Sequence, residues 1–407
     1  MSMHKVKYII LGAGPSGLAF AETLKDKGED SFLILEKEAE AGGLCRSVMV
    51  DGSPFDIGGG HFLDVKRQEV NDLLFRFLPE EEWNLFERDS RIQTKDFVVG
   101  HPFEANIWQM PLEKQVEYLE SIAKAGCNSN EPMPEKFIEW ITWKLGDKIA
   151  KDYMIPYNKK MFADELDELG TYWLSKLPDV SFKETLLSCL TGKAHGTQPG
   201  HAKFYYPKKY GYGEVWLRMA EAMKEHMVYN CCVTELDCDS RVIICADGRS
   251  YQAEIIVTTI PWNSFTTIKN MPQDLTEDIK KLKSSAIETR YREENLDTEA
   301  QWIYYPEEEL PYHRILVRHN FCENSKGYWT ETRKERVELF DKEDKAYRYM
   351  NEYAYPLNTI DKPQIMERLL TFTKSKQIYG LGRWGEHNHY NSDVTVERAM
   401  NLAKEFI

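Results

Sequence analysis

The chain opens with a short apolar run that ends at a glycine-rich turn. Residues 8–11 have the length and composition of a buried strand, and residues 18–27 follow with the composition of a helix that Gly28 ends. A second apolar run at residues 32–35 predicts another strand. This order of strand, helix and strand predicts a βαβ unit in a parallel sheet.

Beyond this unit the pattern turns helical and later returns to strands. Residues 66–88 carry apolar side chains at helical spacing, and residues 111–190 do so over a longer stretch, which predicts a helical insert. Residues 192–200 are polar and aperiodic and predict a loop. The other predicted elements are a hairpin at 91–94 and 97–99, a helix at 214–226, strands at 231–236, 242–246 and 255–259, the last completing the parallel sheet, an antiparallel region at 287–355, and a helix at 395–406 that Asp393 would cap.

The turn after the first strand carries a specific glycine pattern. Gly12, Gly14 and Gly17 have the spacing Gly-X-Gly-X-X-Gly, in which the second glycine lets the backbone approach a pyrophosphate and the third lets helix and strand pack closely. The pyrophosphate would lie at the helix N-terminus, where free N–H groups favour an anion. Glu36, just after the second strand, is placed to accept a ribose hydroxyl. The pattern predicts a dinucleotide cofactor.

Further glycine turns follow at residues 42–43 and 58–60, where a cofactor larger than NAD would need close backbone approach. This combination resembles the FAD-binding fold of flavin amine oxidases, and the resemblance implies FAD. We therefore expect an α/β protein with a Rossmann-like FAD-binding domain on a parallel sheet, a helical insert domain and a substrate domain on a mainly antiparallel sheet. The expected boundaries are 1–95, 200–265 and 375–407 for the FAD-binding domain, 111–199 for the insert, and 96–110 with 266–374 for the substrate domain.

The composition of the chain limits which partners it can bind and where in the cell we expect it. A net charge of −14 over 407 residues disfavours nucleic acid as a partner, because phosphate binding needs a broad basic face. No apolar run reaches 18 residues and none at the start resembles a signal peptide, so we expect a soluble, cytoplasmic protein with no membrane partner. The eight cysteines lack paired ligand spacing, which predicts buried free thiols and no metal site.

Ordered motifs along nearly the whole chain resemble the UDP-galactopyranose mutase family. They include GAGPSGL at residues 12–18, GGGH at 58–61, PFEAN at 102–106, PYNKK at 156–160, FYYP at 204–207, WIYYPE at 302–307, PYHR at 311–314 and GRWG at 382–385. The resemblance implies that reduced FAD, primed by NAD(P)H or another reductant, attacks the anomeric carbon of a nucleotide sugar through its N5 atom. The outcome would be an isomerase (mutase) reaction between pyranose and furanose forms, in polysaccharide biosynthesis.

The resemblance also assigns roles to individual residues. Arg314 and Arg383 match phosphate-binding and active-site arginines, whose planar guanidinium groups bind phosphate bidentately, and His61 matches a histidine packed near the flavin. These three are the catalytic candidates. The cofactor-binding candidates are Gly12, Ala13, Gly14, Pro15, Ser16, Glu36, Lys37, Gly43, Leu44, Gly59, Gly60, Val233, Arg383, Asn391, Ser392 and Val394. The substrate-binding candidates are Phe103, Glu104, Tyr157, Asn158, Phe162, Lys176, His201, Tyr304, Arg314, Phe321 and His389.

Departures from the family pattern cluster on the substrate side. Glu104 stands where the family has a glutamine that contacts uracil, and His201 and His389 replace an asparagine and a tyrosine. An ionised glutamate only accepts hydrogen bonds, so Glu104 would weaken uracil recognition by roughly 1–3 kcal/mol. A base that presents donors would fit better, which predicts a nucleotide sugar other than UDP-galactose.

Two alternatives share the same N-terminal signals. One is an FAD-dependent oxidoreductase of the amine oxidase or protoporphyrinogen oxidase type, in which FAD takes a hydride from the substrate. Such enzymes do not share the PYN segment, the paired arginines or the WIYYP stretch. The other is a flavoprotein that has kept its cofactor and lost its chemistry. Turnover without net electron transfer would separate the mutase from the oxidoreductase.

Overall fold

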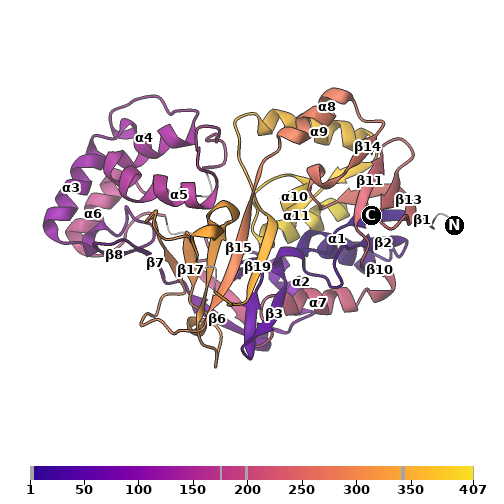
Figure 1. The fold of residues 1–407 in the computed structure, drawn as a ribbon, viewed down its shortest axis with the longest axis horizontal. Helices are drawn as coiled ribbons and strands as arrows, with labels where there is room; N and C mark the ends of the chain where they lie inside the picture. The colour runs from indigo at the N-terminus through magenta and orange to yellow at the C-terminus, as the bar shows by residue number, and fades with distance from the viewer. Residues whose placement is uncertain (1–3, 175–176, 198–199, 341–343, 407) are drawn as a thin grey trace.

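The computed structural model describes residues 4–174, 177–197, 200–340 and 344–406. Figure 1 shows a region of strands and helices with both termini at the right, an antiparallel sheet in the middle and a lobe of helices at the left. One continuous hydrophobic core joins the three, since Phe20, Trp302 and Phe137 belong to the same cluster of buried residues. The expected α/β fold with these three parts is confirmed.

The first predicted strand lies inside a mainly parallel sheet. It pairs in parallel with the strand at residues 32–35 on one side and with the long strand Ser250–Thr258 on the other. The side chains of residues 8–11 are fully buried, because both faces of the sheet are covered, and this explains the unbroken apolar run. Across the sheet the order is β10 (Met227–Val228), β2 (Phe32–Leu35), β1 (His4–Leu11), β13 (Ser250–Thr258), β12 (Val242–Cys245), β11 (Val233–Asp237) and β14 (Thr267–Lys269), with β20 (Ile378–Gly380) beside β13.

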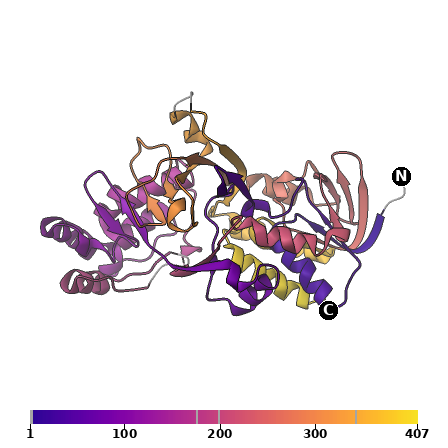
Figure 2. The same cartoon turned by 90° about the horizontal axis from the view of Figure 1, so that it is seen from below.

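Two groups of helices cover the two faces of this sheet. On β1, Tyr8 and Ile10 belong to the core shared with α1, whereas Ile9 and Leu11 belong to a second core shared with α8 and α9. Figure 2 shows α1, α7 and α11 side by side on one face. The helices of this region are α1 (Pro15–Asp26), α2 (Gln68–Phe75), α7 (Gly213–Glu221), α8 (Gln273–Lys281), α9 (Lys362–Ser375), α10 (Gly382–Gly385) and α11 (Ser392–Lys404).

The central sheet has seven strands and is antiparallel except where β16 runs parallel to β7. In order, its strands are β19 (Arg348–Pro356), β15 (Ser284–Arg292), β18 (Tyr328–Arg333), β17 (Arg314–Leu316), β16 (Trp302–Tyr304), β7 (Ser90–Gln93) and β8 (Val98–Gly100). Strand pairing cuts across two expected boundaries. The boundary at residue 95 assigned β7 to the FAD-binding domain, but β7 joins the central sheet, and β14, assigned to the substrate domain, joins the parallel sheet. The domain division as a whole stays a prediction.

The helical insert follows the predicted pattern with two irregularities, a break in a helix and a π-helical turn. It contains α3 (Leu112–Ala123), α4 (Phe137–Ile149), a π-helical turn η5 (Ala150–Met154), α5 (Ile155–Met161) and α6 (Phe182–Thr191). Gly146 breaks the helical path of α4 with a φ of 76°, and an added Cβ there would lie 2.5 Å from the Ser121 carbonyl oxygen. The π turn that follows carries Tyr153 and Met154 to the wall of a cavity.

The prediction of a helix over residues 66–88 is wrong in its second half. Only Gln68–Phe75 is helical, and the acidic residues 80–82 form a short 3-10 turn. The next segment is the strand β6 (Trp83–Glu87), which pairs with β9 (Lys203–Pro207) in a small sheet completed by β5 (Leu63–Asp64). That partner lies about 120 residues away in sequence, so the local helical spacing did not reveal it. A separate hairpin consists of β3 (Ser47–Val50) and β4 (Ser53–Asp56).

Three further expectations need correction. The parallel sheet does not end with the strand at 255–259, because β14 and β20 come later in the chain. The last helix begins at Ser392 after Asn391, and Asp393 does not cap it but forms a buried ion pair with Arg67 at 2.5 Å. Free thiols are found at six cysteines, whereas Cys231 and Cys245 form a disulfide between β12 and the residues leading into β11.

Across the described ranges, none of the helices is both long and apolar enough to span a bilayer. The same residues contain no group of three or more His, Cys, Asp or Glu side chains arranged to hold a metal ion.

Candidate functional site

The glycine fingerprint lies on the floor of a cavity of about 370 Å³, here termed the dinucleotide cavity. Gly14 and Gly43 meet back to back, and a Cβ on Gly43 would lie only 3.1 Å from the Gly14 Cα. Helix α1 starts at Pro15 beside this floor, so its free N–H groups face the cavity. A bare backbone at a helix N-terminus suits a pyrophosphate that must approach closely.

Glu36 stands at the end of β2 and lines the same cavity. Its Oε2 accepts a hydrogen bond from the Ala13 amide at 2.8 Å, and its Oε1 accepts one from the Glu38 amide at 2.9 Å. Burial raises the pKa of this carboxyl, while the two backbone donors act in the opposite direction. Each oxygen keeps a lone pair, so the side chain can still accept a ribose hydroxyl.

A second cavity of about 730 Å³, here termed the large cavity, lies between the helical insert, the central sheet and the segment joining α10 to α11. His61, Arg383, Tyr390 and Ser392 line both cavities. The two spaces therefore meet at these four residues. A long cofactor lying in the dinucleotide cavity would present its far end to the large cavity at this junction.

Arg383 is the main positive charge at the junction. Its Nε and Nη2 donate to the Tyr390 carbonyl at 3.0 and 2.7 Å, and its Nη1 donates to the Ala354 carbonyl at 3.1 Å. Among the described residues it forms no ion pair with a carboxylate, and burial lowers its pKa. Its charge is thus uncompensated by the protein and favours an anion at this point.

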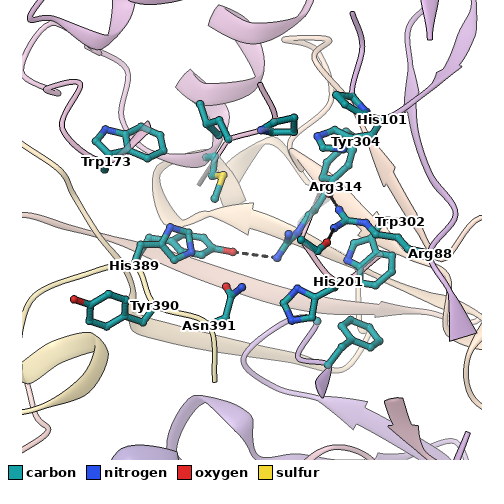
Figure 3. A pocket seen from close by; sticks show the side chains of 18 of the residues that line it. Arg88, His101, Trp173, His201, Trp302, Tyr304, Arg314, His389, Tyr390 and Asn391 are labelled. Atoms are coloured by element: carbon teal, nitrogen blue, oxygen red, sulfur yellow. Dashed lines mark hydrogen bonds between the residues drawn. The ribbon is translucent and has the colours of Figure 1, made fainter. Parts of the chain in front are cut away.

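Arg314, at the start of β17, enters the large cavity beside Tyr304 (Figure 3). Its Nε and Nη2 donate to the two carboxylate oxygens of Glu331 at 2.8 and 2.9 Å, and Nη2 also donates to the Tyr355 hydroxyl at 3.1 Å. Burial lowers the pKa of Arg314, but the charge of Glu331 outweighs it and the pKa is raised well above its usual value. No hydrogen bond within the described chain occupies its Nη1, which leaves that nitrogen for a ligand.

Glu331 connects this arginine to the glycine loop, and the sequence pattern did not single it out. Its Oε1 accepts from the Gly60 amide at 3.2 Å and its Oε2 from the Tyr355 hydroxyl at 3.2 Å. Gly59 has a φ of 87°, and a Cβ there would lie 2.5 Å from Glu331 Oε1. Glu331 therefore fixes both Arg314 and the turn that carries His61. It stands within a run of four polar residues, 330–333, and no motif around it gave a sequence signal.

The large cavity is lined by three histidines, His61, His101 and His201. Each has a buried ring nitrogen that finds no hydrogen-bond partner among the residues that the structure describes. Burial lowers the pKa of His61 to about 3, helped by Arg383 and Arg314, and burial with Arg88 does the same for His101. Burial also lowers the pKa of His201. All three are neutral at pH 7, so each can donate or accept one hydrogen bond to a ligand.

Arg88 lines the large cavity together with Arg314 and Arg383, and the sequence motifs did not predict it. Its Nη2 donates to the Tyr304 hydroxyl at 2.8 Å and its Nη1 to the Gly200 carbonyl at 2.6 Å, while its guanidinium lies 4.9 Å from the ring centre of Trp302. Figure 3 shows it next to Trp302 on the same side as Arg314. A loop arginine after β6 has no motif around it, so only the structure reveals its position.

Most predicted site residues line one of the two cavities. The dinucleotide cavity contains Gly12, Gly14, Pro15, Ser16, Glu36, Lys37, Gly43, Leu44, His61, Val233, Arg383 and Ser392. The large cavity contains Gly60, His61, Phe103, Glu104, Tyr157, Asn158, Phe162, His201, Tyr304, Arg314, Arg383, His389, Asn391, Ser392 and Val394.

Several candidates lie elsewhere. Phe321, expected to touch substrate, is instead a core residue with 2% exposure that packs edge-on against Phe62, Tyr206 and Trp329. Ala13 contributes its amide to Glu36, and Gly59 lies behind the cavity wall against Glu331. Asn391 and Val394, expected at the cofactor, line the large cavity. Lys176 lies outside the described residues.

The family model for flavin containing amine oxidoreductases matches residues 15–291, more than half of the chain. The chain therefore belongs to the flavin-containing amine oxidoreductase family, and its cofactor is FAD. A 53-residue stretch, 13% of this chain, is 47% identical to the "uncharacterized protein in nifH2 3′region" of Methanothermococcus thermolithotrophicus and spans half of that protein's length.

Solved structures with the same fold cover both mutases and oxidases. Reduced UDP-galactopyranose mutase superposes with a TM-score of 0.89 at 22% identity, over 98% of this chain and 93% of that one. A protein described as a putative protoporphyrinogen oxidase from Exiguobacterium sp. 255-15 gives a TM-score of 0.69 at 13% identity, over 100% and 99% of the two chains. A putrescine oxidase variant gives 0.65 at 14% identity, over 99% of both chains. At these identities the likeness shows the fold.

The residues present fit FAD. Gly14 and Gly43 pack against each other and line the dinucleotide cavity with backbone alone, which suits a pyrophosphate, and Glu36 has acceptor capacity for a ribose. At the other end, the unpartnered Nε2 of His61 and the uncompensated Arg383 face the junction. These residues would hold the flavin ring where the two cavities meet.

Proposed function

We propose that this protein is an FAD-dependent nucleotide-sugar mutase that interconverts pyranose and furanose forms of its substrate. The observation that carries the proposal is the position of Arg314 and Arg383, two partly buried arginines that line one cavity at the flavin end of the dinucleotide site. The higher TM-score with the mutase structure, 0.89 against 0.69 and 0.65 for the oxidases, supports the same choice.

The chemistry follows from what each residue can do. When bound and reduced, the flavin supplies a nucleophilic nitrogen for the anomeric carbon. Arg314 would hold the diphosphate through its Nη1 while the bond to the sugar breaks, and would keep that leaving group in place for its return. Arg383 would stabilise negative charge at the junction, since three hydrogen bonds to backbone carbonyls fix its orientation. Neutral His61 would donate or accept a hydrogen bond there.

An FAD-dependent oxidoreductase is the second candidate function. The family model and the two oxidase structures favour it, because they share the nucleotide-binding region with this chain. The number of electrons transferred per product molecule distinguishes the mutase from the oxidoreductase. A mutase turns over after one initial reduction, whereas an oxidase consumes an acceptor with every product molecule formed.

The test is an assay of the reduced holoenzyme with a panel of nucleotide sugars, measuring pyranose–furanose interconversion under anaerobic conditions. Arg314→Ala removes the diphosphate contact and leaves Glu331 without its arginine. We expect kcat/KM to fall at least thirtyfold, which corresponds to a loss of about 2–5 kcal/mol of transition-state stabilisation. The matched control is Arg91→Ala on strand β7 of the same sheet, where Arg91 lies outside the large cavity lining and pairs with Asp89 at 2.6 Å. Flavin content is measured for both, so cofactor loss is not mistaken for loss of chemistry.

Substrate-dependent acceptor consumption without interconversion would overturn the mutase proposal and favour the oxidoreductase. Near wild-type kcat/KM in Arg314→Ala would overturn the role of Arg314.

A further inference from the structure

The large cavity is also lined by a buried carboxyl, that of Glu104, which among the described residues is contacted only by its own backbone amide. Glu104 is 7% exposed and lines the cavity. Among the described residues, no other residue donates a hydrogen bond to its carboxyl group and no cation forms an ion pair with it. A buried polar group of this kind is costly unless a ligand satisfies it.

A row of aromatic rings leads from Arg314 to this carboxyl. Tyr157, whose hydroxyl is influenced by the charge of Arg314, lies 5.5 Å from Tyr153 between ring centres. Tyr153 in turn stacks on Phe103 at 5.6 Å with an interplanar angle of 16°. Phe103 immediately precedes Glu104. The cavity thus runs from the flavin junction, past the arginine proposed for the diphosphate, to an aromatic wall that ends at a carboxyl group.

This order matches the parts of a nucleotide sugar. The sugar must lie at the junction and the diphosphate at Arg314, which leaves the aromatic end for the nucleobase. Planar bases stack on aromatic rings without regard to their identity. Their identity is then decided by the hydrogen bonds that Glu104 can make.

We propose that Glu104 selects a guanine nucleotide, so that the substrate is a guanosine-diphosphate sugar. An ionised carboxylate accepts two hydrogen bonds in parallel, and guanine presents two adjacent donors, its N1–H and an N–H of its 2-amino group. Uracil presents one N–H between two carbonyl oxygens, so one carboxylate oxygen would face a carbonyl. This inference rests on the proposed function, because it assigns the base of the same substrate.

The preference should depend on pH. Burial raises the pKa of Glu104 to about 7. Below that pH the carboxyl is protonated and offers one donor and one acceptor, the pattern that uracil needs; above it the carboxylate favours guanine. The weakening of uracil recognition expected from Glu104 therefore applies to its ionised form.

The groups that surround Glu104 do not account for this pH dependence, so we assign it to Glu104. Lys144 of α4 and Asp179, which precedes α6, act on it in opposite directions and pair with each other at 2.5 Å. His101 on the same loop stays neutral because burial lowers its pKa to about 3, and Tyr153 stays neutral because burial raises its pKa well above its usual value.

The experiment measures dissociation constants of GDP, UDP, ADP and CDP for the purified holoenzyme between pH 6 and 8.5. The ratio of GDP to UDP affinity cancels the protonation of the diphosphate, which the two ligands share. We expect GDP to bind most tightly at pH 8, by roughly tenfold to a hundredfold over UDP, and the ratio to fall as the pH drops through 7. Glu104→Gln should favour UDP and remove the pH dependence of the ratio, whereas Glu87→Gln on the exposed side of β6 should change neither.

Tighter binding of UDP, ADP or CDP than of GDP at pH 8 would overturn the guanine assignment while leaving the mutase proposal intact. A GDP to UDP ratio that does not change with pH, or that is the same in Glu104→Gln, would overturn the role of Glu104. Failure of all four nucleotides to bind at any pH would instead overturn the proposed function.

Discussion

At the scale of single residues, burial decides which groups around the site carry charge. It holds His61 and His101 neutral, with pKa values of about 3, and it moves the pKa of Glu104 to about 7. The arginines stay charged because a guanidinium does not lose its proton at any ordinary pH. The large cavity of an acidic protein is therefore locally positive, which suits an anionic ligand.

Asp56 shows the same effect in the core and yields a prediction on stability. It is fully buried, and burial raises its pKa to about 7, although Ser47 and Tyr206 donate hydrogen bonds that act in the opposite direction. The folded state therefore holds a proton that the unfolded chain, with a pKa near 3.9, releases between about pH 4 and 7. The stability that Asp56 contributes is complete below about pH 4 and is lost as the pH rises to 7.

The Asp56→Asn variant removes this titration. The free energy of unfolding of the wild type should fall relative to the variant by up to about 1.4 kcal/mol per pH unit across that window. Urea denaturation of both proteins at pH 4.5, 5.5, 6.5 and 7.5 measures it. A constant difference between the two proteins at all four values would contradict the prediction.

At the scale of elements, the βαβ unit shows two different reasons for a glycine. Gly17, inside the start of α1, has no unusual φ, but a Cβ there would lie 2.0 Å from the Gly12 carbonyl oxygen. Gly28, just after the end of α1, has a φ of 83° and open space around it. Gly17 is needed because a side chain there would collide with the turn at Gly12. Gly28 is needed because its backbone adopts a left-handed conformation.

Substitution by alanine should separate these two reasons. Gly17→Ala pushes α1 away from the turn, so we expect the purified protein to lose most of its flavin. Gly28→Ala should keep its flavin and lose only about 1 kcal/mol of stability through left-handed strain. The absorbance ratio at 450 and 280 nm and chemical denaturation measure the two effects. Equal flavin content in the two variants would show that the close contact at Gly17 is not needed.

Elements were predictable where their partners are close in sequence. The first strand, helix α1 and the hairpin at β7 and β8 have local signals and appear as expected. Strand β6 was mistaken for helix because β9 stabilises it across about 120 residues. The role of Asp393 was misjudged because Arg67, its partner, comes from a distant loop. Local spacing carries no information about such contacts.

At the scale of the whole molecule, the dinucleotide cavity is closed by both ends of the chain. Its lining comes from residues 11–16, 35–46, 61, 231–233, 259–264, 349–353 and 383–395. A ligand that binds all of these segments at once binds the folded state alone. It must therefore stabilise the whole fold.

We expect FAD added to the apoprotein to raise its thermal unfolding temperature by several degrees, since a ligand at a hundred times its Kd contributes about 2.7 kcal/mol. Riboflavin is the control ligand, because it lacks the pyrophosphate and adenosine that reach Gly14 and Glu36. Its effect at the same concentration should be much smaller. Differential scanning calorimetry measures both, and equal shifts would contradict the predicted binding mode.

The sequence by itself determined the cofactor class, the βαβ unit and the arginines Arg314 and Arg383, because each rests on a local motif. Only the tertiary structure decided which of the motif residues meet. It placed His61, Arg383, Tyr390 and Ser392 at the junction of two cavities and removed Phe321 from the site. It also revealed that Glu331 pairs with Arg314. It showed in addition that burial raises the pKa of Glu104, since the charge of a carboxyl depends on its burial and neighbours. Those neighbours come from strands and helices far apart in the chain, and no local pattern records them.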